Sequence, residues 1–502
     1  MTNSEIEQFR VSGTPVRRPN EPGAGERRQL IESESGCPSR GNFWYSRRQA
    51  LAIVLALLAL VRVYSDITPP FQSPDEFNHV KRAYLLSKGV FFATVTEGVV
   101  GGEIDTGLMT YLKCFGNIPL NYGNKLERTT VRECNAMRFS GKATFSALPN
   151  TAEYFPLLYS PQAVALFIGR IAGLTVATSY YLARLFSQLA SLSLVLFAMS
   201  IFPFPPAVLA LLLLPMNLFQ FAAASLDAMS FATAIAISAL FMKAYRPKQP
   251  FGVGMSATVS IGILLLSLAR IVYIALAPLL LVMYYRRKSP SYIVYFAAVV
   301  SIWCCWMLYL RTTILPEAML GGNGEQAGGT WATLLMAWSF CKMAFRTLIS
   351  PEVVGGYLQS FIGVLGASDT PLSLFAYTVL GVGTLAVLIL TLEGGIRRFL
   401  DEGGVMLGLA GLATLPLVLF AAFQWTPPDA TTIDGVQGRY FYPTAFFLFY
   451  SVGGAYLSKT RITACVAVIS LIAFSSIELS IPALLDRYWA AEYADSQSVN
   501  QS

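Results

Sequence analysis

The chain has 502 residues, of which 54% are hydrophobic and only 13% are charged, and its formal net charge is +7. Apolar runs that approach the roughly 20 residues of a membrane span recur from residue 50 to residue 482. This pattern excludes a soluble enzyme built around one core, and the runs are continuous rather than alternating, which argues against a membrane β-barrel. A modest positive charge in such a chain reflects its inner loops, so we infer no nucleic-acid partner. We therefore expect an all-α polytopic helical membrane protein.

The amino-terminal stretch differs from the remainder. Residues 1–46 are rich in Pro, Gly, Ser, Glu and Arg, a composition typical of a disordered tail. We predict a membrane domain over 47–485 and a short C-terminal tail over 486–502. The first span follows Arg47 and Arg48, and positive flanks stay inside, so the N-terminus is expected in the cytoplasm. Run lengths and positive clusters predict eleven spans, near 49–64, 179–201, 206–224, 227–245, 251–269, 271–286, 291–310, 372–392, 403–423, 440–457 and 461–482.

This topology predicts a long first extracytoplasmic loop over 65–155 and a second over 311–371. Cys114 and Cys134 share the first loop and form a candidate disulfide if that loop faces an oxidising compartment. Two apolar stretches do not fit the count of spans. We predict that 156–174 lies at the outer interface or dips back into it, and we leave open whether 156–174 or 331–348 spans the membrane.

The first motif that can carry chemistry is PPFQSPDEFNHVKRAY, residues 69–84. It can simply start a helix, with Ser73 as cap and Glu76 completing a capping box. However, Asp75, His79 and Arg82 are spaced to share one helical face, and Glu76 and His79 are three residues apart. A carboxylate there can accept a proton from a hydroxyl, and His79 can assist it. Asp75, Glu76 and His79 are also the candidate ligands for a divalent cation, although they do not make a closed metal site.

The second motif is DGVQGRYFYP, residues 434–443. Arg439 is placed where water meets lipid, and its planar guanidinium suits a phosphate. Alternatively, it is an interfacial arginine flanked by aromatic residues such as Tyr440. Gln437 and Gly438 beside it favour a site, because glycine permits close backbone approach.

Two further charged residues fall at the predicted outer side. Arg270 stands between two apolar halves, and a phosphate contact is a reasonable role for it. Asp227 begins a later span, where capping a helix is the simpler interpretation and shaping a site is the alternative. The sequence shows no nucleotide-binding loop, zinc motif or hydrolase elbow at a fitting position, so no cofactor is predicted beyond that candidate cation.

Several segments together resemble a known family. PPFQSPDEFNHVKRAY, YFPLLYSPQA, LPMNLFQFAAASLDA, LARIVYIALAPLLL and GVQGRYFYP occur in the order seen in the bacterial membrane family called domain of unknown function 2142, over about residues 50–455. That family is similar to the GT-C superfamily, whose members transfer sugars from polyprenyl phosphates at the outer face. The region of Asp227 departs from the family pattern, in which an extra asparagine is common.

The resemblance implies a GT-C-like fold in the bacterial inner membrane and a role in building envelope polysaccharide. It implies Asp75 as the catalytic base, supported by Glu76 or His79, and phosphate binding by Arg439 and Arg270. We add Arg82 and Gln437 to the phosphate-binding candidates, and Asp227, Gly438 and Tyr440 to the residues that shape the site. The expected partners are a polyprenyl-phosphate-linked sugar, an unidentified acceptor and the bilayer. The alternative functions are a transporter or flippase for a lipid-linked glycan, or a non-catalytic assembly partner.

Overall fold

The structure is a computed structural model that describes residues 44–148, 150–246, 250–314, 330–392, 403–427, 429–452 and 457–489. Most of the predicted N-terminal tail and C-terminal tail therefore lies outside the described residues. The described end of the N-terminal tail packs on the helices. Tyr45 is 5% exposed and donates a hydrogen bond to the carbonyl of Met199. Ser46 caps the first described helix through the backbone N–H of Gln49.

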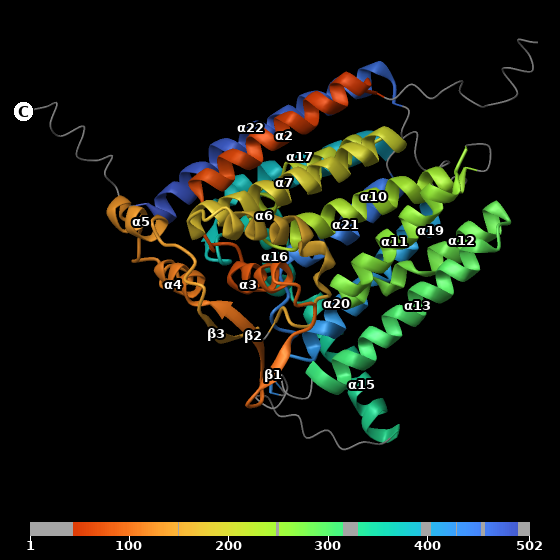
Figure 1. Ribbon diagram of the computed structural model, residues 1–502. Coiled ribbons are helices and arrows are strands. Elements are labelled where there is room, and N and C mark those ends of the chain that lie inside the picture. The colour runs from red at the N-terminus through yellow and green to blue at the C-terminus, as the bar shows by residue number, and fades with distance from the viewer. Residues whose placement is uncertain are drawn as a thin grey trace, which may run out of the picture. The chain divides into compact units, whose positions relative to one another are not determined.

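The prediction of a polytopic helical membrane fold is confirmed. Within the described residues, seven segments are long and apolar enough to cross a membrane. They are α2 (Arg47–Ile67), α7 (Val176–Ile201), α10 (Asp227–Tyr245), α13 (Ser291–Tyr309) with the turn Leu310–Ile314, α17 (Leu374–Leu392), α19 (Gly404–Leu412) with α20 (Thr414–Phe423), and α22 (Lys459–Tyr488). Figure 1 shows α2 and α22, from opposite ends of the sequence, running side by side.

The other four predicted spans coincide with shorter or interrupted helices. They are α8 (Pro206–Leu212) with α9 (Pro215–Ala222), α11 (Val253–Ala269), a 3₁₀ turn (Ile271–Leu276) with α12 (Pro278–Arg287), and the turn Gly438–Phe441 with α21 (Tyr442–Val452). Proline starts α8, α9 and α12, where its missing N–H costs no helical hydrogen bond. These interruptions place irregular backbone inside the bundle, which is tolerated in membranes where protein surrounds it.

Helix α10 is the central element of the bundle. Almost all its residues are buried, from Asp227 at its first position to Ala244 near its end. It packs on α7, α11 and α21. Because its hydrophobic residues cover every side, no face of α10 is left for lipid or water. Asp227 is therefore held at a fixed place at one end of the bundle.

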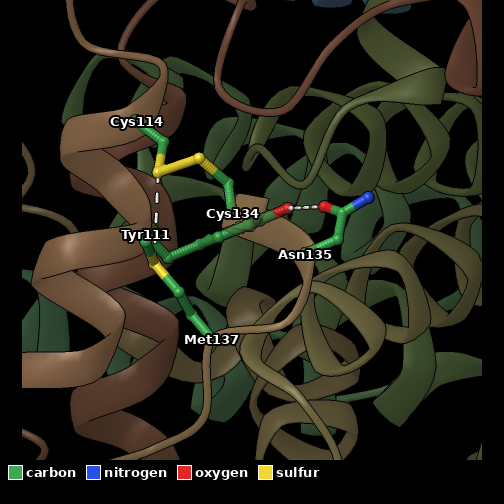
Figure 2. The surroundings of a disulfide bond; sticks show 5 residues. All are labelled: Tyr111, Cys114, Cys134, Asn135 and Met137. Atoms are coloured by element: carbon green, nitrogen blue, oxygen red, sulfur yellow. Dashed lines mark hydrogen bonds between the residues drawn. A yellow bond between two sulfur atoms is a disulfide. The ribbon is translucent and has the colours of Figure 1, made fainter. Parts of the chain in front are cut away.

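The first loop forms a small folded cap. Its elements are α3 (Glu76–Ser87), β1 (Thr94–Thr96), β2 (Val99–Asp105), α4 (Thr106–Cys114), α5 (Arg128–Asn135) and β3 (Ala143–Ala147), with β1–β2–β3 as an antiparallel sheet. In the structure a disulfide joins Cys114 at the end of α4 to Cys134 in α5. Figure 2 shows this bond beside Met137, with the hydroxyl of Tyr111 3.4 Å from the Asn135 side-chain oxygen. The disulfide thus ties together α4 and α5, two of the three helices of the cap.

The C-terminal end of α22 closes on this cap. The helix continues to Tyr488, past the predicted start of the tail at residue 486, and the Leu126 N–H donates to the Tyr488 carbonyl at 2.8 Å. Arg487 is buried, pairs with Asp369 at 2.7 Å, and donates to the carbonyl of Ile118 at 2.6 Å. The last turn of α22, the last helix of the described residues, therefore holds the first loop in place.

The two ambiguous stretches form helices. Residues 156–174 fold as a 3₁₀ turn (Pro156–Tyr159) and α6 (Ser160–Ile171). At 12 residues, α6 is about 18 Å long, too short for a hydrocarbon core of about 30 Å. The second stretch lies in α15 (Thr330–Ile349), which falls outside the seven candidate spans. It precedes α16 (Pro351–Gly363) and the strands β4 (Val364–Leu365) and β5 (Thr370–Pro371).

Candidate functional site

Asp75 lies just before α3 and does not cap it. Its backbone is in the left-handed region, with φ 62°, and its side chain makes no capping bond. This conformation is rare for residues other than glycine, so surrounding contacts must hold it. Asn150 supplies one of them by donating its amide to Oδ1 of Asp75, and Asn78 donates to Asn150 at 2.6 Å. The carboxylate of Asp75 is thus bonded to Asn150 and not to a backbone N–H of α3.

Arg439 connects two aspartates. One terminal nitrogen lies 2.7 Å from Oδ2 of Asp75, and the other lies 2.6 Å from Oδ2 of Asp227. Arg270 forms an ion pair with the second oxygen of Asp227. The result is a continuous chain of alternating charges, Asp75–Arg439–Asp227–Arg270. Its two carboxylates and two guanidinium groups sum to zero charge, as burial of ionic groups requires.

Access to this ion cluster is unequal. The side chains of Arg439 and Asp227 are 2% and 3% exposed, whereas that of Asp75 is 32% exposed. Arg270 is intermediate at 16%. A ligand approaching from the first loop therefore meets Asp75 first, and the buried pair of Arg439 and Asp227 last.

Aromatic rings line the guanidinium groups. Tyr440 lies under Arg439 at 4.9 Å and under Arg270 at 5.7 Å, measured from guanidinium carbon to ring centre. Tyr154 lies under Arg270 at 4.9 Å, and its hydroxyl accepts a hydrogen bond from that arginine at 3.3 Å. Such rings stabilise a cation without neutralising it. Both arginines therefore keep positive charge available to an anion.

The residues before Arg439 explain its position. Gln437 accepts a hydrogen bond from Nε of Arg439 at 2.6 Å. Gly438 lies directly against α16, where an added Cβ would be 2.1 Å from the backbone nitrogen of Phe361. Its own N–H donates to the hydroxyl of Ser360 at 2.9 Å. Only glycine fits at this position. The backbone contact therefore fixes the point from which the Arg439 side chain extends.

Electrostatics assign a protonation state to the exposed end of the cluster. Burial opposes ionisation of Asp75, but the charge of Arg439 outweighs it and holds the pKa of Asp75 below its usual value. Burial lowers the pKa of His79 to about 4, so this imidazole is neutral at pH 7. Its Nδ1 lies 2.6 Å from the hydroxyl of Tyr159. At neutral pH the site thus presents an ionised carboxylate and a neutral histidine.

Glu76, which with His79 was one of two candidates to support Asp75, makes its contacts with other residues. Glu76 is fully buried and pairs with Arg184 of α7 at 3.4 Å. Its oxygens also accept from the hydroxyl of Tyr180 and the N–H of Ala224, each at 2.7 Å, and from the N–H of Ser73 at 3.2 Å. These contacts hold α3, α7 and the segment before α10 together, which makes Glu76 a structural residue.

Arg82 is likewise outside the ion cluster, although the sequence grouped it with the phosphate-binding candidates. It donates to the backbone carbonyls of Phe91 at 2.6 Å and Tyr154 at 3.4 Å. The candidate metal set also does not converge, since Glu76 faces Arg184. Among the described residues, no group of three or more His, Cys, Asp or Glu side chains is arranged to hold a metal ion.

Sequence reasoning missed three residues beside the site. Asn150 and Tyr154 contact Asp75 and Arg270, but a lone asparagine and a tyrosine in a loop carry no distinguishing pattern. Glu153 is partly buried, and burial raises its pKa to about 7 against the opposing charge of Arg270. It can therefore hold or release a proton near neutral pH. Glu153 directly precedes Tyr154, the first residue of the motif YFPLLYSPQA, and this position is the one signal that could have drawn attention to it.

Fold and site together define a class: a polytopic helical membrane protein with a buried aspartate–arginine cluster at the end capped by its first loop. The family described as "Predicted membrane protein (DUF2142)" matches residues 51–448, and the chain belongs to that family. A comparison with curated proteins finds no match.

Among solved structures, the chain is similar to the crystal structure of ArnT from Cupriavidus metallidurans bound to undecaprenyl phosphate. The match covers 86% of this chain and 78% of that chain, with 12% sequence identity and a TM-score of 0.33.

Proposed function

We propose that the protein is a membrane glycosyltransferase that moves a sugar from a polyprenyl-phosphate donor to an envelope glycan, lipid or protein acceptor. The observation that carries this proposal is the alternating cluster of Asp75, Arg439, Asp227 and Arg270 at one end of the bundle. It combines a partly exposed carboxylate with two guanidinium groups. Transfer from a glycosyl phosphate needs this equipment: a base for the acceptor and positive charge for the leaving phosphate.

The donor phosphate can enter by exchanging with Asp75. The four charges of the cluster sum to zero, so adding an anion next to all four groups would leave a net negative charge in a buried place. Asp75 is the most exposed member and holds Arg439 through a single oxygen, Oδ2. A phosphate oxygen that replaces Oδ2 of Asp75 as the acceptor from Arg439 keeps the charges around Arg439 and Arg270 balanced. It also frees Oδ2 beside the bound donor.

The freed Asp75 then serves as the base. The acceptor oxygen attacks the anomeric carbon while its proton passes to Asp75, and the bond from that carbon to the phosphate oxygen breaks. The electron pair leaves with the polyprenyl phosphate, whose negative charge increases from about one to nearly two. Arg439 and Arg270 therefore bind the departing phosphate more strongly than the donor, which lowers the barrier. Asp227 keeps both arginines aligned during this change.

Two features support the proposal that the site lies at the outer face of a bacterial inner membrane, with the N-terminus in the cytoplasm. The disulfide between Cys114 and Cys134 belongs to the same loop as Asp75, and disulfides form in oxidising compartments. At the other end of α10 and α12 lie Lys243, Arg286 and Arg287, as expected for the cytoplasmic side.

The test is binding of polyprenyl phosphate to the purified full-length protein in detergent, with and without a divalent cation. We expect saturable binding that Arg439→Ala abolishes. In contrast, Asp75→Asn should bind several-fold more tightly, because it removes the negative group that competes for Arg439. Asp66→Asn is the matched control, since Asp66 is exposed and pairs only with Arg62 on the surface.

The opposing sign of the two variants separates this mechanism from a general loss of folding. Asp75→Asn should nevertheless transfer no sugar once a donor and acceptor are found, because its amide cannot accept the proton. Failure of the folded wild type to bind any polyprenyl phosphate would refute the proposal. Binding accompanied by movement of the lipid across vesicles, without release of sugar, would instead identify a flippase.

A further inference from the structure

Arg82 is a buried cation without a counter-ion. Its side chain is fully buried, and Nη2 makes its two hydrogen bonds to main-chain carbonyls. Nε and Nη1 have no hydrogen-bond partner, and no carboxylate of the described residues forms an ion pair with it. Burial lowers the pKa of Arg82, opposed only by the phenols of Tyr159 and Tyr309. A charge in this condition is costly unless an anion completes the site.

A second unpartnered donor lies nearby on α13. Trp306 is 6% exposed, and its indole Nε1 has no hydrogen-bond partner. Its ring contacts Tyr309, one turn further along α13, with ring centres 5.2 Å apart. Tyr309 is also one of the two tyrosines whose phenols act electrostatically on Arg82. The two unpartnered donors, from α3 and α13, therefore share a neighbour.

Two pairs of consecutive residues connect the donors. Arg82 bonds to the carbonyls of Phe91 and Tyr154. Trp306 packs against the rings of the next residues in each pair, Phe92 at 6.2 Å and Phe155 at 5.1 Å between ring centres. Arg82 and Trp306 therefore contact adjoining residues of the same two segments, and the contacts of Trp306 are with aromatic rings.

This place is separate from the ion cluster. Arg82 follows Asp75 by seven residues, which is about 10 Å along a helix. Arg270 and Arg439 are already paired with Asp227 and Asp75, whereas Arg82 forms no ion pair with a described residue. An anion at Arg82 would therefore break no ion pair.

We infer that Arg82 and the indole N–H of Trp306 form a second anion site, suited to a phosphate group. The guanidinium offers N–H donors in a planar fork that matches phosphate oxygens, and the indole adds one more. The source can be free phosphate or a lipid headgroup. The neighbouring surface of α13 exposes Leu308 and Ile302, which favours a phosphate carried on an acyl chain. This inference does not depend on the proposed transferase activity.

The test uses delipidated full-length protein in phosphate-free detergent, titrated with short-chain phosphatidic acid, inorganic phosphate or phosphatidylcholine. Thermal unfolding and direct binding are both recorded. We expect phosphatidic acid to raise the unfolding temperature saturably and phosphatidylcholine to have no such effect. An equal response to inorganic phosphate would assign the site to the free anion, and a response to phosphatidic acid alone would assign it to a lipid.

Arg82→Met should abolish the response and, without ligand, should raise the unfolding temperature, because it removes an uncompensated buried charge. An arginine with a purely structural role would give the opposite sign. Trp306→Phe keeps the ring and should weaken binding about tenfold, the value of one hydrogen bond. Trp303→Phe is the matched control, since Trp303 lies on the same helix and also has an unpartnered Nε1, but no ring contact joins it to Phe92 or Phe155.

Two results would overturn the inference. One is a phosphate response that persists unchanged in both Arg82→Met and Trp306→Phe. The other is a response that disappears only in Arg439→Ala, which would place the anion in the ion cluster. Loss of polyprenyl-phosphate binding in Arg439→Ala, with the phosphatidic acid response retained, would establish two independent sites.

Discussion

Replacing Gly438 by alanine tests whether the backbone contact with α16 positions Arg439. The new Cβ would lie 2.1 Å from the nitrogen of Phe361 and 2.5 Å from the carbonyl carbon of Ser360. Both are main-chain atoms, and real Cβ contacts essentially never fall below 3.0 Å. The two segments must therefore separate by roughly 0.9 Å, the difference between 3.0 and 2.1 Å, a shift that flexible side chains cannot absorb.

The expected magnitude follows from this displacement. Overpacking of a rigid contact costs about 1–3 kcal/mol, and loss of the Gly438 hydrogen bond to Ser360 adds about 1 kcal/mol. If the shift reaches the guanidinium, the 2.7 Å bond from Arg439 to Asp75 exceeds hydrogen-bond range. We expect the free energy of unfolding of Gly438→Ala to fall by about 2–4 kcal/mol, with loss of polyprenyl-phosphate binding.

Gly435→Ala is the matched control in the same loop. Gly435 has φ 76°, but an added Cβ there meets nothing within 4 Å. Strain alone should destabilise this variant by about 1 kcal/mol, without a change in phosphate binding. Both variants are compared by unfolding in detergent and by titration with polyprenyl phosphate. Equal effects of the two substitutions would refute the role of the backbone contact.

Two other substitutions test buried groups. Glu76→Gln should destabilise the protein by about 3–5 kcal/mol, because Arg184 is left as an uncompensated buried charge; Arg184→Met in the same chain should recover part of this loss, and the exposed Glu103→Gln should be neutral in the same unfolding assay. A small effect of Glu76→Gln would contradict the structural role. His79 has a folded pKa of about 4 against an ordinary value of 6.5, so the unfolded chain binds its proton first and stability is lost as the pH falls from about 6.5 toward 4. Between pH 7 and pH 5 this loss amounts to about 2 kcal/mol, and His79→Gln should lose that much less stability over the same interval; parallel curves for variant and wild type would show that the imidazole does not titrate in this way.

Much of the fold follows from local sequence properties. Apolar runs placed a helix at each of the eleven predicted spans, because hydrophobic length is a local property. The two arginines and Asp75 also stood out one at a time, as charges next to apolar sequence. The pairing of these arginines with Asp227 could not be predicted, because 43 and 212 residues separate Asp227 from Arg270 and Arg439 along the chain. No local pattern records a contact over such separations.

The assignment of Glu76 shows a second limit. Asp75 and Glu76 are adjacent and chemically alike, so the sequence alone does not distinguish their roles. The left-handed turn at Asp75 sends its carboxylate to Arg439, while Glu76 enters α3 facing Arg184. The position of Arg184 within an apolar span was the available signal, because a charge there needs a partner. Asn150 offered no signal at all.

The contact between α22 and the first loop has a consequence for the order of biosynthesis. Leu126 bonds to Tyr488, and Ile118 to Arg487, so the cap that carries Asp75 receives its final support from the last turn of the last described helix. A chain emerging from the ribosome exposes Asp75 hundreds of residues before either group is made. During that interval the loop lacks both of these contacts. Any truncation before residue 487 would remove both contacts that join α22 to the cap.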